Sequence, residues 1–256
     1  MSSLSDDVVR ARRLTAEVWI VLGLSLGQSG VYALMRIFVR LTDTTPLGEQ
    51  STALNSSLSE RPYVDLIYQL LEIGFALVPV ALALYLLADS GKAAVRRIGF
   101  TFARPGRDLA AGVGLAALIG LPGIGFYLAG RALGITVSIN PAALNDYWWS
   151  IPILILAAVK NAVLEEVLVV GYLLERLKEL SWRWPAATLV SAALRGSYHL
   201  YQGIGPFFGN LVMGLVFNEY YRRRGRTMPL VVAHTLLDVV SFVGYWLLPE
   251  TWRALL

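Results

Sequence analysis

The chain has 256 residues, of which 56% are hydrophobic and only 16% charged, with a net charge of +4 and a mean hydropathy of +0.57. Soluble domains carry about 25% charged residues, so this composition argues against a soluble enzyme. The sequence contains no cysteine, which excludes disulfides, thiolate nucleophiles and cysteine-ligated metals. The basic residues lie in short clusters between apolar runs, a pattern typical of membrane topology and not of nucleic-acid binding.

Long apolar segments recur along the whole chain. A spanning helix needs about 20 mostly apolar residues. We therefore predict a single integral membrane domain over 1–256, all-α and polytopic, with about seven transmembrane helices. The fifth and sixth segments are short, which calls for tilt, local thinning of the bilayer or a re-entrant turn at 201–206. In chain order the predicted spans are 15–40, 64–88, 108–130, 150–176, 184–200, 206–221 and 228–248.

Lysine and arginine are distributed unequally between the two sides of these spans. Cytoplasmic loops carry the excess of basic residues, so we predict a multi-pass protein of the cell membrane with a cytoplasmic N-terminus and an external C-terminus. The predominance of arginine over lysine suggests a bacterial source. The opposite side has only Arg40, Arg61, Arg131 and Arg253. The basic side collects Arg10, Arg12, Arg13, Lys92, Arg96, Arg97, Arg104, Arg107, Arg176, Lys178, Arg183, Arg222, Arg223, Arg224 and Arg226.

Ionisable residues gather in the predicted spans of the second half. An ionisable side chain in mid-membrane costs at least about 2.5–3.5 kcal/mol on insertion scales, so such residues are functional candidates. At 1.5 Å per residue, Glu165, Arg195 and Asp238 each lie about 15–16 Å from the cytoplasmic end of their helix. These depths predict a shared polar site in 150–248. Its candidate members are Glu165, Glu166, His199, His234 and Asp238, supported by Arg195 and Asn161.

Helical spacing adds detail to this site. Glu165 and Glu166 differ by about 100° around their helix, so we expect them to point in different directions, one toward substrate and one toward the scaffold. Asn161 precedes Glu165 by one turn and is expected to bond it or to serve helix packing. Three carboxylate and imidazole groups could also hold zinc with an open coordination position, and for that alternative the ligands would be Glu165, His199 and His234.

The ordered motifs over 92–248 resemble the CAAX protease and bacteriocin-processing family of intramembrane endopeptidases. Its four-helix core carries Glu-Glu-x-x-x-Arg, Phe-x-x-x-His and His-x-x-x-Asn/Asp motifs. Glu165-Glu166 matches the first motif, the segment ending at His199 the second, and His234 to Asp238 the third. The resemblance implies a metal-independent peptidase in which Glu165 and His199 activate water and Glu166 orients the site. It also implies that His234 and Asp238 line the oxyanion pocket.

Two positions depart from the family pattern. The arginine of the first motif is replaced by Val170, and the phenylalanine of the second is Arg195. A buried arginine needs a partner, so we predict that the guanidinium has moved between helices and pairs with Glu166.

The sequence thus predicts an intramembrane endopeptidase that cleaves a peptide or membrane-associated protein near the cytoplasmic face, without a cofactor. Two other readings stay open. Buried Glu, His and Asp chains also form proton relays, as in a proton-coupled transporter. The same fold could also serve as a non-catalytic scaffold or immunity protein. The sequence leaves the oligomeric state unknown.

Overall fold

The computed structural model describes residues 2–88, 93–249 and 251; the basic residues Lys92 and Arg253 lie outside this part. The protein is built from α-helices, in agreement with the predicted all-α polytopic membrane class. In chain order its elements are α1 (Ser2–Gly23), α2 (Leu26–Leu41), the 3-10 turn η1 (Leu47–Glu49), β1 (Ser51–Ala53), α3 (Pro62–Ala76), α4 (Val78–Leu87), α5 (Ala94–Arg97), α6 (Pro105–Ala132), β2 (Ser138–Asn140), α7 (Ser150–Glu165), the π-helix η2 (Glu166–Tyr172), α8 (Leu173–Glu179), α9 (Trp184–Ser197), the 3-10 turn η3 (Leu200–Gln202), α10 (Ile204–Arg224) and α11 (Met228–Leu247).

The first predicted span, 15–40, is interrupted. Asp6–Gly23 and Leu26–Leu41 meet at an angle of 55°. Small residues cause this bend, as Gly and Ser commonly do in kinked helices. The Ser25 hydroxyl donates a 2.6 Å hydrogen bond to Val21 O, and a Cβ built at Gly27 would lie 2.7 Å from Leu22 O. One long apolar run therefore becomes two helices.

Several helices are long and apolar enough to cross a bilayer. Within the described part of the chain these are Pro62–Leu87, Pro105–Ala132 and Met228–Leu247, and the bent pair α1–α2 passes the same test if it is one span. Large side chains on these helices are exposed, including Trp19, Phe38, Phe75 and Tyr85, as expected of surfaces that face lipid. The total of seven spans stays a prediction.

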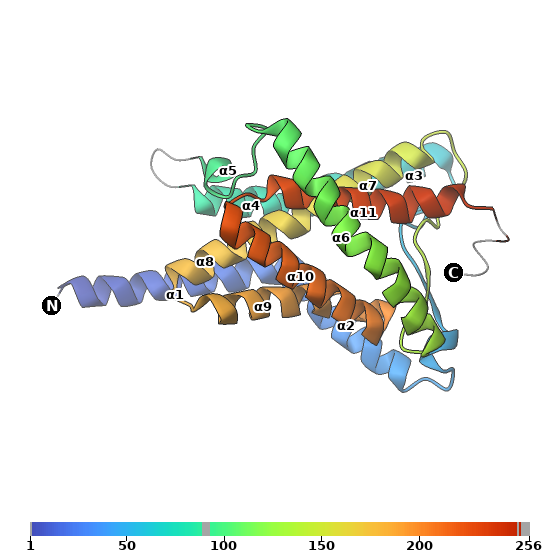
Figure 1. Cartoon of the computed structure of the whole chain (residues 1–256), viewed down its shortest axis with the longest axis horizontal. Helices are drawn as coiled ribbons and strands as arrows, with labels where there is room; N and C mark the ends of the chain where they lie inside the picture. Colours follow the sequence, from blue (N-terminus) through green and yellow to red (C-terminus); the bar gives the residue numbers. More distant parts are fainter. Residues whose placement is uncertain (1, 89–92, 250, 252–256) are drawn as a thin grey trace.

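Figure 1 shows how the elements are arranged. The start of α1 projects at one end of the molecule, and α5 and α8 lie toward that same end (Figure 1). Helix α9 packs along α10, and α11 packs against both α6 and α7. The helices of the predicted site, α7, α9 and α11, thus share an interior that α10 and α6 flank.

A small sheet, absent from the sequence prediction, joins distant loops. Strands β1 and β2 are parallel, with Ser51 opposite Ser138, and an isolated bridge pairs Thr136 with Gly203. Gly203 has φ of +115°, and a Cβ there would lie 2.7 Å from Ile135 O, so this position requires glycine. The loop between α6 and α7 is thereby fixed to the turn that follows His199.

Helix α7 continues into α8 through a π-helical segment, η2. A π-helix closes hydrogen bonds from i to i+5 and is frequent at functional sites. The segment begins at Glu166, and every one of its seven residues is buried. It therefore places an irregular turn directly at the pair of glutamates.

Candidate active site

A guanidinium bridges the two buried glutamates at the α7–η2 junction. Arg195, on α9, is fully buried, and its Nη2 donates to both carboxylate oxygens of Glu166 at 2.8 Å. Its Nη1 donates to Glu165 Oε2 at 3.3 Å. The planar fork of arginine suits this double recognition, whereas the single ammonium of lysine does not. The predicted pairing of Arg195 with Glu166 is confirmed.

The two glutamates do not diverge as their helical spacing predicted. Both carboxylates reach the same guanidinium, and both have an oxygen within 4.8 Å of the other and of a His234 nitrogen. Both residues keep αR backbone angles where η2 begins, so the winding between them changes little. The long side chains then close the remaining angle, so the two carboxylates form one site.

Helix α11 contributes the third carboxylate and a histidine. His234 Nδ1 lies 2.7 Å from Glu166 Oε1, and His234 Nε2 lies 3.7 Å from Asp238 Oδ1. Asn161 Nδ2 donates to Asp238 Oδ2 at 3.1 Å. The expected bond from Asn161 to Glu165 is therefore wrong: the amide reaches across to α11, which packs on α7. Arg195, Glu166, His234, Asp238 and Asn161 form a continuous polar chain across three helices.

Glu165 has different surroundings from Glu166. The Tyr198 hydroxyl donates a 2.7 Å hydrogen bond to Glu165 Oε2, and His199 Nε2 lies 4.0 Å from the same oxygen. Neither ring nitrogen of His199 has a hydrogen-bond partner in the described part of the chain, although both are shielded from solvent. Glu165 retains 10% side-chain exposure, whereas Glu166 has none. Glu165 and His199 thus form the accessible side of the site.

Tyr198 is a site residue that sequence reasoning missed. It follows Arg195 by three residues and precedes His199, yet it belongs to none of the motifs. The one usable signal was its chemistry, because a buried tyrosine hydroxyl needs a hydrogen-bond partner. In a span with few other polar groups, the neighbouring glutamate was the available acceptor.

Helix α10 packs against Arg195 of the site. The Arg195 guanidinium carbon lies 5.5 Å from the Phe217 ring centroid, in a cation–π contact. Gly214 allows α10 to approach, because a Cβ there would lie 3.0 Å from Ala192 Cα and 3.3 Å from Arg195 Cδ. The guanidinium is therefore shielded from solvent, with α10 packed against it and the two glutamate carboxylates as its partners.

The geometry also defines which groups could hold a metal ion. The ligand atoms that cluster within 4.8 Å belong to Glu165, Glu166 and His234, not to the predicted zinc set with His199. His199 lies past the end of α9 with its Nε2 4.0 Å from Glu165 Oε2, and it is not part of this group of three. Two carboxylates and an imidazole suit a divalent cation chemically. Yet Arg195 already occupies both oxygens of Glu166, and its fixed positive charge opposes a cation there.

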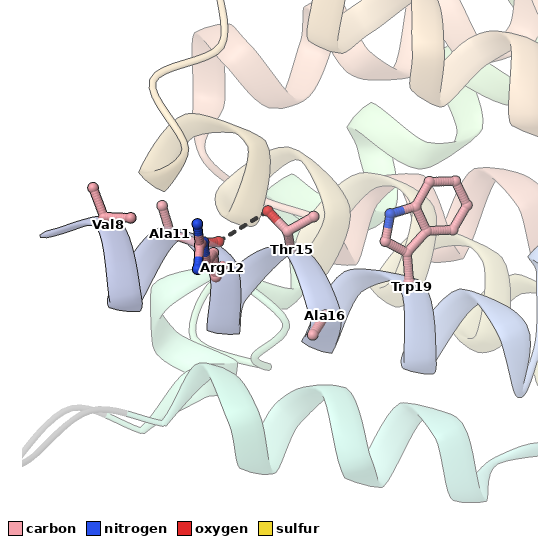
Figure 2. Close-up of a pocket in the computed structure, with 6 residues that line it drawn as sticks. All are labelled: Val8, Ala11, Arg12, Thr15, Ala16 and Trp19. Carbon is pink, nitrogen blue, oxygen red and sulfur yellow. Dashed lines mark hydrogen bonds between the residues drawn. The ribbon is translucent and has the colours of Figure 1, made fainter. Parts of the chain in front are cut away.

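A shallow hollow on α1 lies away from this chemistry. Figure 2 shows its lining by Val8, Ala11, Arg12, Thr15, Ala16 and Trp19, which all come from one helix. Its polar contact is local, a 2.9 Å bond from the Thr15 hydroxyl to Ala11 O (Figure 2). The hollow contains none of the predicted site residues and offers no titratable pair for catalysis.

The fold and site together define a polytopic membrane protein with a buried cluster of carboxylates, histidines and one arginine. Residues 147–240 match the family described as type II CAAX prenyl endopeptidase Rce1-like, a range that includes every site residue named above. No curated protein and no solved structure matches the chain.

Residues 147–240 therefore belong to the CAAX protease and bacteriocin-processing family, as the sequence motifs indicated. The family is one of CAAX-type intramembrane proteases, which are hydrolases acting on peptide or protein substrates. Its members work in membranes, in keeping with the exposed apolar helices of this chain.

Proposed function

We propose that this protein is an intramembrane endopeptidase in which Glu165, assisted by His199, activates a water molecule to cleave a peptide bond. The observation that carries the proposal is the asymmetry between the two glutamates. Both oxygens of Glu166 are bound by Arg195, whereas Glu165 remains partly exposed beside His199, whose ring nitrogens have no hydrogen-bond partner among the residues that the structure describes. A carboxylate that is already neutralised holds a site together; one that faces a histidine across 4.0 Å can act as a base.

The proposed reaction begins with a water molecule beside Glu165 and His199, whose Nε2 lies 4.0 Å from Glu165 Oε2, too far for a direct hydrogen bond. Glu165 removes a proton from the water while the water oxygen attacks the peptide carbonyl carbon. The tetrahedral intermediate then collapses, and the protonated Glu165 gives its proton to the departing amine. Glu165 thus accepts a proton from water and returns it to the leaving amine, and the proposed reaction needs no cofactor.

His234 is the proposed donor to the oxyanion. Glu166 holds its Nδ1, and its Nε2 faces Asp238 at 3.7 Å. Both nitrogens are donors when the ring is protonated, and in that form Nε2–H can turn from Asp238 to the developing oxyanion. An ionised Asp238 cannot itself donate, so we assign it the orientation of His234, with Asn161 holding its other oxygen.

We further propose that the substrate is a peptide or a membrane-associated protein segment cleaved near the cytoplasmic face. The basic residues on α1, α5 and α8 support a cytoplasmic assignment for the end of the molecule where these elements lie (Figure 1). Glu165 precedes Arg176 by eleven residues, or about 16 Å of helix. The reacting bond would then lie close to the middle of a hydrocarbon core about 30 Å thick, within reach from the cytoplasmic side.

The test is cleavage of a peptide library by purified protein in detergent, comparing the native chain with Glu165→Gln. We expect the substitution to lower kcat by about 10²- to 10⁴-fold, as loss of a general base does. Glu175→Gln is the matched control, because Glu175 is a partly buried carboxylate on the same run of helix outside the site. Full activity in Glu165→Gln contradicts the assignment. Activity lost with a chelator and restored by zinc would instead support the metal alternative.

A further inference from the structure

Oxygen Oε2 of Glu165 is surrounded by donors from α9 and the turn that follows it. The Tyr198 hydroxyl donates to it at 2.7 Å, Arg195 Nη1 at 3.3 Å, and His199 Nε2 lies 4.0 Å away. The other oxygen, Oε1, accepts no hydrogen bond from the residues that the structure describes and is not among the fully shielded unpaired atoms. The two oxygens of one carboxylate thus have different environments.

We propose that Tyr198 is a positioning residue for the reaction: its hydroxyl locks Glu165 Oε2 and leaves Oε1 as the oxygen that takes the proton from water. This inference rests on the proposed function and assigns the reactive atom within it. Tyr198 contacts the base and not the substrate, so it acts through Glu165.

The strength of the contacts supports this division of roles. A hydroxyl that donates to a carboxylate at 2.7 Å forms a charge-assisted hydrogen bond, about twice as strong as a neutral one. The Arg195 contact to the same oxygen is longer, and that guanidinium is shared with Glu166. Tyr198 is therefore the main restraint on rotation of the Glu165 carboxylate.

Packing keeps the hydroxyl in place. Tyr198 is only 5% exposed and belongs to the main hydrophobic core. Its ring lies 4.9 Å from the His199 ring, centroid to centroid, at an interplanar angle of 44°. The same side chain therefore borders both members of the proposed water-activating pair, and a freely rotating carboxylate would lose its alignment with His199.

The experiment compares steady-state cleavage by the native protein, Tyr198→Phe and Tyr221→Phe. Tyr221 is the matched control, since its buried hydroxyl also donates to a glutamate, Glu175, at 3.2 Å but lies outside the site. Tyr198→Phe should lower kcat by about 10- to 100-fold, the value of one charge-assisted hydrogen bond, with KM within twofold. Tyr221→Phe should leave both constants unchanged.

A second series separates positioning from packing. Fluorotyrosine and difluorotyrosine placed at position 198 change the donor strength of the hydroxyl and hardly change the ring volume, so kcat should change stepwise while KM and the melting temperature stay constant. A constant kcat along this series, or native kcat in Tyr198→Phe, overturns the role of Tyr198 alone, provided that Glu165→Gln is inactive. Native activity in Glu165→Gln would overturn the proposed function as well.

Discussion

Two buried clusters of charge in this molecule have similar members and different organisation. The first is the site, where Glu165 and Glu166 share the Arg195 guanidinium and Asp238 lies 3.7 Å from His234. The second, here called the charged network, joins α1, α5 and α8 through Arg97, Arg176, Glu17, Glu175 and Glu179. Both clusters pair arginine with glutamate in a largely apolar protein.

In the charged network every carboxylate has at least one cation as a partner. Its three carboxylates meet Arg97, Arg176, Arg13 and Lys178, and Arg176 also donates to the backbone oxygen of Leu86 at 2.6 Å. The site has three carboxylates, one arginine and two histidines, and the ring nitrogens of one of them, His199, have no hydrogen-bond partner among the described residues. A cluster that satisfies its own charges stabilises a fold, whereas one that leaves donors and acceptors open can serve chemistry. Four variants separate the two.

The largest effect on cleavage is expected from Arg195→Ala. The change leaves the carboxylate of Glu166 buried without its partner and should destabilise the protein by about 3–5 kcal/mol. It should also abolish cleavage, because Glu165 and Glu166 lose their shared partner and Glu166 holds His234. Melting temperature and peptide cleavage measure the two effects. Arg195→Lys keeps the positive charge but not the planar guanidinium, so compared with Arg195→Ala it should recover more of the stability than of the activity. Native stability and native cleavage in Arg195→Ala would refute the anchoring role.

A smaller effect is expected from Gly203→Ala, which changes no charge. At φ of +115° an alanine is strained, at a cost of about 1–3 kcal/mol, and its Cβ would press on Ile135 O. The turn carrying His199 should move, so cleavage should fall by about tenfold while the charged network is unaffected. Gly225→Ala provides the comparison, because Gly225 has φ of +62°, a Cβ built there would meet no atom within 4 Å, and the residue lies outside the site. Equal cleavage by the two variants would show that the bridge to Thr136 does not position His199.

Arg176→Gln in the charged network should lower the stability of the protein and leave catalysis unchanged. Arg176 is buried, but Glu17 and Glu179 retain 14% and 16% side-chain exposure, so water can replace part of what is lost. We expect a loss of about 1–3 kcal/mol in unfolding free energy and kcat within twofold of native. A large fall in kcat at unchanged KM would mean that the network is coupled to the site, contrary to the comparison.

The smallest effect is a pH dependence of stability that involves Glu179. Burial raises the pKa of this carboxyl, but hydrogen bonds and charge from Arg97 and Arg176 outweigh it, and the pKa lies below the ordinary value of 4.5. A depressed pKa contributes stability above the unfolded value, and this contribution is lost as pH falls below about 4.5. Thermal unfolding from pH 6 to pH 3 should therefore show a shallower loss in Glu179→Gln than in the native protein. Parallel curves would contradict this contribution.

The sequence was sufficient for the fold class and for most of the site. Apolar runs predicted the helices, and buried ionisable residues identified Glu165, Glu166, Arg195, His234 and Asp238, because each is costly in a membrane without a partner. The partner of Arg195 followed from the same argument. The catalytic roles of these residues stay predictions until the cleavage assays are done.

Other features depended on contacts that no local pattern carries. The bend between α1 and α2, the sheet formed by 51–53 and 138–140, and the bond from Asn161 to Asp238 all depend on tertiary packing. The convergence of Glu165 and Glu166 depends on the reach of both side chains toward the Arg195 guanidinium. A helical wheel shows the direction in which a side chain leaves the helix and not where its end group lies.

The π-helix also affects how this chain should be aligned with its relatives. Because η2 closes from i to i+5, the position that bonds back toward Glu166 is Gly171 and not Val170. An arginine at Val170, where the family motif has one, would be displaced around the helix, so the guanidinium reaches Glu166 from α9 instead. In length, the segment resembles an α-helix with one inserted residue. Deleting a single residue from 167–170 would therefore restore regular α-helical winding between α7 and α8, and the fourth position after Glu166 would again lie one turn from it.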